Sequence, residues 1–507
     1  MLVQGNKIIV GNSNGKDIVF DAKMANRHGL IAGATGTGKT YTIKALAEAF
    51  SEMGVSVFLA DVKGDVVGLS DCNPVNLWDI YGENGIPLRA TVDSMGSVLL
   101  ARILRLNDLQ ADILSIAFSI ASKMGFSLVT LQDLKTILNY MARESKSLEM
   151  EYGKISAQSI SAIIRSVVAL DISGGEKFFG NPQFSIIDLF ENRMGASTIN
   201  ILDSTSLVND SYMYSAFMLW LMQELFRVLP EVGDVEKPKM VFFFDEAHLL
   251  FKGASKVFVE KVEQVVRLIR SKGVGIYFCT QNPKDIPDGV LAQLGNKIQH
   301  ALHAYTPSEQ KGVKMASASF RPNPNFNTYE AITTLGIGQA LVSLLQEDGS
   351  PSVVEQVAIL PPKSRTGCID KDTRTALIEN SVYYGKYNQT INPNEVYNEL
   401  IRTSDFVKGK SFGASQIQYL QETFLSNPSF MHNHSWKYGV CLYALDLMEN
   451  NLHRLSNYDV AMRVCNSQEL ELCRFGSLQL NGESWQEVED RAIQEAYTLA
   501  RSILRAV

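Results

Sequence analysis

A glycine-rich stretch near the start of the chain has the residue types and spacing needed to bind a chain of phosphates. Residues 33–40 read Gly-Ala-Thr-Gly-Thr-Gly-Lys-Thr and match the pattern G-x-x-x-x-G-K-[ST] at every position. Glycines let backbone amides turn toward phosphate oxygens, and a helix that follows presents its positive N-terminal end. We therefore predict that Lys39 reaches the β- and γ-phosphates of ATP and that the Thr40 hydroxyl binds Mg²⁺. The expected nucleotide ligands are Gly33, Ala34, Thr35, Gly36, Thr37, Gly38, Lys39, Thr40, Tyr41 and Arg27.

Two adjacent carboxylates follow a continuous apolar run at residues 240–244, which is typical of a buried strand. Such a strand places Asp245 near the metal, through its water shell, and leaves Glu246 where it can orient and deprotonate an attacking water. The alternative is a strand that ends in a solvated acidic turn. A kinase acting on small molecules need not activate water, so Glu246 favours ATP hydrolysis.

Polar and basic groups around the next apolar strand, residues 274–279, complete the candidate site. Gln281 is predicted to sense the γ-phosphate or to hold the lytic water, with a helix or turn cap as the alternative. Arg267 and Arg270 lie one helical turn apart and are candidate arginine fingers, which a neighbouring subunit can supply. A solvated helix face is their alternative. Arg27 precedes the phosphate loop and is expected to reach the nucleotide, in its own subunit or across an interface.

Hydrophobic periodicity predicts an α/β fold around these residues. Strand 30–32, the phosphate loop, helix 39–53 and strand 55–60 form one βαβ unit, which implies a parallel sheet with helices on its faces. Residues 7–10 and 17–20 are predicted to form a hairpin through Asn14-Gly15. Further helices are expected at 98–106, 112–122, 131–142, 157–170 and 212–228, and further strands at 197–202, 240–244, 274–279 and 340–345. The predicted organisation is a hairpin at 1–20, a first part of the ATPase core at 21–93, a helical insertion at 94–195, a second part of the core at 196–360, and a mostly helical C-terminal extension at 361–507.

Composition narrows the classes of function. The 507 residues suffice for two to four domains, and the net charge of −7 argues against a surface coated in positive potential. Contact with nucleic acid would need a local basic surface such as a channel. No apolar run reaches the roughly 18 residues that cross a bilayer, and the start lacks an export signal, so no membrane segment and a cytoplasmic location are expected.

Together these motifs resemble the HerA/FtsK superfamily of P-loop ATPases, and within it the YjgR-type HerA-like proteins. The resemblance is carried by residues 26–40, 60–65, 244–251, 280–287, 320–324 and 360–365. It implies a RecA-like core, assembly into a ring that is typically a hexamer, and ATP bound between subunits. It also implies Asp245 as the metal-side acid, Glu246 as catalytic base and Gln281 as sensor, with Arg267 or Arg270 as finger and Arg27 as a nucleotide contact.

Three functions are compatible with these features to different degrees. The first is an ATP-driven DNA translocase or helicase acting on double-stranded DNA, with Lys252, Lys256 and Lys261 as candidate phosphate contacts. The second is a ring ATPase that acts on or regulates a protein partner, bound through the C-terminal helical region. The acidic net charge and the short segment before the core favour this second function. The third, a small-molecule kinase, is disfavoured by the Asp-Glu pair.

Overall fold

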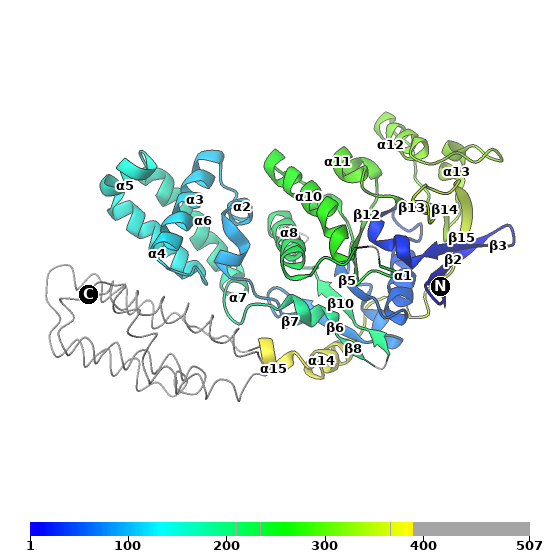
Figure 1. Cartoon of the computed structure of the whole chain (residues 1–507), viewed down its shortest axis with the longest axis horizontal. Coiled ribbons are helices and arrows are strands. Elements are labelled where there is room, and N and C mark those ends of the chain that lie inside the picture. The colour runs from blue at the N-terminus through cyan, green and yellow to red at the C-terminus, as the bar shows by residue number, and fades with distance from the viewer. Residues whose placement is uncertain (194, 208–209, 234, 366, 389–507) are drawn as a thin grey trace. The chain divides into compact units, whose positions relative to one another are not determined.

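A mixed β-sheet of 13 strands runs through the part of the chain that the structure describes. This computed structural model describes residues 1–193, 195–207, 210–233, 235–365 and 367–388 (Figure 1). The strand order is β1-β2-β15-β14-β13-β4-β12-β11-β5-β10-β6-β7, with β3 paired to β2. From β13 to β7 neighbouring strands are parallel, and from β1 to β13 they are antiparallel. The expected α/β fold with a parallel central sheet is therefore confirmed.

The strands of the sheet fall into a parallel and an antiparallel group. The parallel strands are β4 (Gly29–Ala32), β5 (Ser56–Asp61), β6 (Val75–Asp79), β7 (Ile86–Pro87), β10 (Ile199–Asp203), β11 (Met240–Phe244), β12 (Val274–Thr280) and β13 (Asn296–Gln299). The antiparallel strands are β1 (Leu2–Gln4), β2 (Lys7–Ser13), β3 (Lys16–Asp21), β14 (Gln339–Ser343) and β15 (Glu355–Ile359). A separate two-stranded sheet pairs β8 (Asn192–Arg193) with β9 (Ala196–Ser197).

The described residues also contain α-helices that follow and connect these strands. They are α1 (Lys39–Glu52), α2 (Val92–Ile103), α3 (Asp108–Lys123), α4 (Leu131–Arg143), α5 (Ser145–Tyr152), α6 (Ala157–Leu170), α7 (Glu176–Phe178), α8 (Ser211–Val228), α9 (His248–Phe251), α10 (Lys256–Ile269), α11 (Asp288–Leu291), α12 (Pro307–Ala318), α13 (Thr328–Thr334), α14 (Lys371–Glu379) and α15 (Tyr384–Tyr387). Figure 1 shows α2 to α6 grouped as a helical region. The four helices expected there form as α2, α3, α4 and α6. By length and composition no single described helix could cross a membrane, whereas the bent pair Ser145–Tyr152 and Ala157–Phe178 meets that test.

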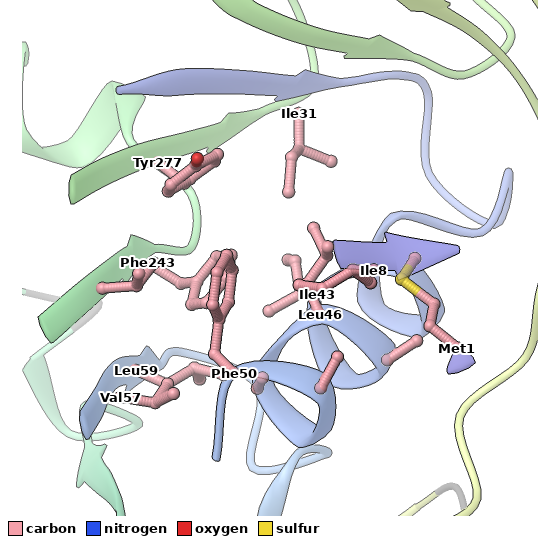
Figure 2. Packing of buried hydrophobic residues seen from close by; sticks show 14 of the residues in the cluster. Met1, Ile8, Ile31, Ile43, Leu46, Phe50, Val57, Leu59, Phe243 and Tyr277 are labelled. Atoms are coloured by element: carbon pink, nitrogen blue, oxygen red, sulfur yellow. The ribbon is translucent and has the colours of Figure 1, made fainter. Parts of the chain in front are cut away.

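The central strands are apolar along their whole length because both faces of the sheet are covered. On one face Val57, Phe243 and Tyr277 join the main core cluster, where Phe50 of α1 packs against them (Figure 2). On the other face Phe58 of β5 stacks on Phe242 of β11, and Phe244 of β11 stacks on Phe278 of β12. Phe251 of α9 packs against Phe278. The phosphate-loop helix α1 is thus anchored directly to the strands that carry the candidate site.

The N-terminal hairpin forms as β2 and β3 and extends the main sheet instead of standing apart. Ala358 and Ile359 of β15 pair with Asn12 and Gly11 of β2. A Cβ atom at Gly11 would lie 2.2 Å from the carbonyl oxygen of Ala358, so this close approach requires glycine. The hairpin and the last strand of the sheet therefore depend on each other.

After β15 the described chain contains helices and no further strand, as the sequence predicts for residues beyond 361. We call residues 361–365 and 367–388 the C-terminal strap. Buried Glu48 of α1 accepts hydrogen bonds from the amides of Lys363 at 2.7 Å and Ser364 at 2.9 Å. Further along, Arg374 forms an ion pair of 2.7 Å with Asp203 at the end of β10. The helices expected in residues 401–507 lie outside the described residues.

Candidate nucleotide site at the carboxyl edge of the sheet

The glycine-rich loop connects the end of β4 to the first turn of α1. Gly38 has a φ angle of 115°, a backbone conformation that residues with a Cβ rarely adopt. Lys39 Nζ donates to the carbonyl oxygens of Gly33 at 2.6 Å and Ala34 at 3.0 Å. Burial lowers the pKa of Lys39, and the nearby charge of Lys63 lowers it further. A cation therefore lies inside the loop, at the helix end where an anion is most favourable.

The outer side of the loop is open, whereas its base is tied to the sheet. Thr35, Gly36 and Tyr41 are exposed and Thr40 is half-buried, so a ligand has access from that side. At the base, the amide of Ala34 donates to a carbonyl oxygen that follows β13 at 2.8 Å. The loop thus combines a backbone tied to the sheet with an accessible outer side.

His300 supports the loop from below and was not recognised from the sequence. Its Nε2 lies 2.9 Å from Thr42 Oγ1, and its Nδ1 lies 2.9 Å from the carbonyl oxygen of Gln339. A Cβ atom at Gly33 would lie 2.5 Å from the Cβ of His300, which shows how closely the two backbones pack. Burial lowers the pKa of His300 to about 4, so the ring is neutral at pH 7.

The carboxylate pair lies at the same edge of the sheet as the phosphate loop. Strand β12 pairs with β4 on one side and with β11 on the other, and all three are parallel. The phosphate loop follows the carboxyl end of β4, Gln281 follows that of β12, and the pair Asp245–Glu246 follows that of β11. Thr35 Oγ1 lies 3.4 Å from Gln281 Oε1, which joins the loop to the central strand. The sheet thus brings together Lys39, Gln281 and Glu246.

Glu246 is buried and fully engaged. Its Oε1 lies 2.7 Å from Lys63 Nζ, and Gln281 Nε2 donates to both carboxylate oxygens at 3.2 and 3.3 Å. His248 Nδ1 lies 3.3 Å from Oε2. Burial alone would raise the pKa of Glu246, but the hydrogen bonds from Lys63 and Gln281 outweigh it and hold the pKa below its usual value. The carboxylate is therefore ionised. Its lowered pKa also makes it a weaker base toward water while these contacts are in place.

Asp245 and Thr40 fit the requirements of a divalent cation. Burial raises the pKa of Asp245 to about 7, and the charge of Glu246 adds to this effect while Lys63 opposes it. A nearby cation would offset the cost of ionising this buried carboxyl group. Mg²⁺ commonly takes one or two protein ligands together with phosphates and water, which matches a hydroxyl and a carboxylate beside a phosphate loop.

The three candidate arginines lie at the opposite edge of the sheet. Arg27 precedes β4 directly, and Arg267 and Arg270 precede β12, so all three are at the amino ends of strands whose carboxyl ends hold the site. Arg270 is close enough to buried His28 to lower its pKa. Four residues of β4 span about 13 Å, so within one subunit these arginines are remote from the phosphate loop. The structure does not bring them to the nucleotide site of their own chain.

Lys63 is the main site residue that sequence reasoning missed. It follows β5, which pairs with β11 on the side away from β12. Asp61 at the end of β5 accepts hydrogen bonds from the amides of Lys63 at 3.2 Å and Gly64 at 2.7 Å, which shape the loop. The available signal was its position, because charged residues just after a parallel strand are expected at the ligand-binding edge.

Comparison with known proteins places this geometry in a family. The family model described as helicase HerA-like C-terminal matches residues 6–73 and 70–419. The DNA double-strand break repair helicase HerA of Saccharolobus solfataricus is 22% identical over 352 residues, which cover 67% of this chain and 66% of that protein. Its namesake in Sulfolobus acidocaldarius is 23% identical over 335 residues, covering 62% of each. The match thus spans under two thirds of the length of these relatives.

Solved structures agree on the fold. VirB4 of Thermoanaerobacter pseudethanolicus superposes with a TM-score of 0.51 at 14% identity, covering 71% of this chain and 98% of that one. The bacterial conjugative coupling protein TrwB, in an N-terminally shortened unbound form, gives a TM-score of 0.50 at 14% identity and covers 71% and 91%. These likenesses confirm a RecA-like core. Because the HerA-like family model matches well over half of the sequence, the chain belongs to the HerA-like P-loop ATPases.

Proposed function

We propose that this chain hydrolyses ATP with Mg²⁺ and works as a ring-forming motor of the DNA translocase or helicase type. The observation that carries the ATPase part is the convergence of Lys39, Gln281 and Glu246 at the carboxyl ends of three adjacent parallel strands. A cation for phosphates, a carboxylate for water and an amide between them are the groups that hydrolysis of a terminal phosphate requires.

Each residue has a distinct role in this proposal. Lys39 exchanges the loop carbonyl oxygens for phosphate oxygens, while Thr40 and Asp245 hold the magnesium ion. When bound, Mg²⁺ neutralises charge on the phosphates. Glu246 orients the attacking water and takes its proton, and Gln281 connects the carboxylate to the phosphate loop.

The position of the arginines supports a ring. Arg27, Arg267 and Arg270 are remote from the phosphate loop of their own chain, so a contact with the terminal phosphate needs a second copy of the chain. In a head-to-tail ring each copy presents one surface to a different surface of its neighbour, so the amino edge of one sheet can face the carboxyl edge of the next. We propose that ATP lies at this interface, with a hexamer as the expected ring.

The DNA part of the proposal is supported by the names of the HerA relatives and by exposed lysines. Lys311 and Lys314 lie one turn apart on α12 and line, with Tyr329, an open hollow of about 530 Å³. Cations one helical turn apart share a face and can contact successive phosphates. The earlier candidates Lys252, Lys256 and Lys261 are exposed, and Lys256 is paired with Glu260.

Two variants test the ATPase. Lys39→Ala should abolish binding of Mg-ATP, because the cation inside the loop is lost. Glu246→Gln should keep binding and slow hydrolysis by about a hundredfold or more. Lys16→Ala, at the exposed start of β3, serves as the matched control and should change neither quantity. Normal hydrolysis by Glu246→Gln would refute the assigned base.

A second measurement separates the motor from the protein-directed alternative, which the net charge of −7 favours. The ATPase rate is measured with double-stranded DNA, with single-stranded DNA and without DNA across a salt series. Stimulation that fades with salt supports the motor, because phosphate contacts release counterions. A rate indifferent to DNA at every salt concentration supports the alternative. Light scattering and electron microscopy with and without ATP test the ring, and a strictly monomeric active enzyme would contradict it.

A further inference from the structure

Two lysines lie at the candidate site, and the ammonium group of each contacts oxygen atoms of the protein. Lys39 Nζ contacts the carbonyl oxygens of Gly33 and Ala34, while Lys63 Nζ lies 2.7 Å from Glu246 Oε1. Lys39 must give up its partners when a triphosphate enters the loop. Lys63 would likewise have to leave its present partner to contact the triphosphate, and that partner is the carboxylate expected to activate water.

The loop that carries Lys63 has a fixed backbone and an accessible side-chain end. One carboxylate oxygen of Asp61 accepts hydrogen bonds from the amides of Lys63 and Gly64. The other oxygen accepts a hydrogen bond of 3.2 Å from the amide of Val66. The Lys63 side chain is 38% exposed, whereas that of Glu246 is only 6% exposed. A long flexible stem on a fixed loop can redirect its ammonium group without refolding the loop.

Lys63 is within electrostatic reach of the phosphate loop. Its charge acts on Lys39, and the charges of Asp245 and Glu246 act on Lys63 in turn. A terminal phosphate bound by Lys39 would therefore add negative charge within reach of Lys63. For Lys63 the exchange of a carboxylate for phosphate oxygens replaces one charge-assisted hydrogen bond with another, and Glu246 keeps the two hydrogen bonds from Gln281.

We propose that Lys63 is a switch between Glu246 and the terminal phosphate of ATP. In the nucleotide-free chain it occupies one oxygen of the Glu246 carboxylate, which is then not available to the attacking water. When ATP binds, Lys63 moves to the terminal phosphate and Glu246 becomes free to orient water. ADP lacks that phosphate, so Lys63 stays on Glu246. This inference rests on the proposed ATPase function.

A double-mutant cycle of affinities tests the switch. Dissociation constants for Mg-ADP and for a non-hydrolysable ATP analogue are measured with the full chain and with Glu246→Gln, Lys63→Met and the double variant. Glu246→Gln removes the competing carboxylate, so it should bind the analogue about tenfold more tightly with ADP unchanged. Lys63→Met should bind the analogue about tenfold more weakly, again with ADP unchanged. In the Lys63→Met background, Glu246→Gln should have no further effect.

Controls distinguish a switch from a structural role. Lys63→Arg keeps a cation and should retain most of the preference for the analogue, and Lys16→Met on the hairpin should behave as wild type. The Glu246→Gln comparison needs no change at Lys63, so it remains informative if Lys63→Met unfolds. Equal loss of affinity for both nucleotides, or the same Glu246→Gln effect in both backgrounds, would overturn the switch alone. A wild-type chain that binds neither nucleotide would overturn the proposed function as well.

Discussion

Gln281 Nε2 lies 3.2 Å from one carboxylate oxygen of Glu246 and 3.3 Å from the other, so one amide group straddles the expected base. The oxygen of the same amide lies 3.4 Å from Thr35 Oγ1 in the phosphate loop. The side chain of Gln281 therefore links the phosphate loop to the carboxylate of Glu246, so a change in one can be transmitted to the other.

Replacement of this side chain should affect turnover more than binding. Gln281→Ala is expected to lower kcat for ATP by about 10- to 100-fold, because Glu246 loses an orienting hydrogen bond, while nucleotide affinity stays within about threefold. Steady-state kinetics with a direct binding assay separates the two. Gln264→Ala, on the exposed face of α10, is the matched control. An unchanged kcat would show that Gln281 acts only as a turn residue.

Arg102 should connect the helical region to the segment that follows Glu246. Its Nε donates to Ser215 Oγ at 2.7 Å, Nη2 donates to the carbonyl oxygen of Lys252 at 3.2 Å, and the guanidinium lies 4.1 Å from the ring centre of Phe258. Arg102→Ala should lower the free energy of unfolding by about 2 to 4 kcal/mol, as hydrogen bonds and a cation–π contact are lost. Arg102→Lys should recover only part, because it lacks the planar fork.

Urea unfolding measures the effect of Arg102, and Arg165→Ala on the exposed face of α6 is the control. If Arg102→Ala matches Arg165→Ala in stability, the contacts of Arg102 contribute little. A normal unfolding midpoint with altered ATPase would instead indicate coupling to the site.

Two buried histidines should make stability depend on pH. Burial lowers the pKa of His28 and of His300 to about 4 from the usual 6.5. Between these values the unfolded chain binds more protons than the folded one, so the free energy of unfolding falls as pH decreases. Each histidine should contribute a loss of about 2 kcal/mol between neutral pH and about pH 5.

Buried carboxyl groups have the opposite effect, so the test compares variants. Burial raises the pKa of Asp61 to about 6 and that of Asp245 to about 7, which favours the folded state as pH falls. The His28→Asn variant lacks the pH-dependent loss that His28 contributes. The difference in free energy of unfolding between wild type and this variant should therefore shrink as pH falls from 7 to 5. A difference that stays constant with pH would contradict the buried neutral ring.

The C-terminal strap should detach from α1 when Glu48 is replaced. The carboxylate is buried and accepts hydrogen bonds from the backbone amides of Lys363 and Ser364. Glu48→Ala leaves both amides without their acceptor, so it should cost about 2 to 3 kcal/mol and speed hydrogen exchange at residues 363 and 364. Hydrogen–deuterium exchange followed by mass spectrometry reads this directly. Glu52→Ala, which removes an exposed ion pair with Lys363, should have a much smaller effect.

Sequence reasoning succeeded where short-range patterns decide the structure. The limits of β11 agree at every residue with the apolar run before Asp245, and α6 begins and ends where its periodicity predicts. It failed for β13, whose residues Asn296–Gln299 are mostly polar. This segment is a strand because β4 and β14 pair with it on both sides, a tertiary influence that overrides weak local preference.

The sequence by itself determined the phosphate loop, the carboxylate pair and the elements that carry them, because each depends on neighbours within a few residues. Only the tertiary structure decided that Lys63 contacts Glu246 and that Arg270 lies close to buried His28. The order of parallel strands controls both outcomes. That order depends on which faces are buried together by segments far apart in the chain, and no local pattern encodes it.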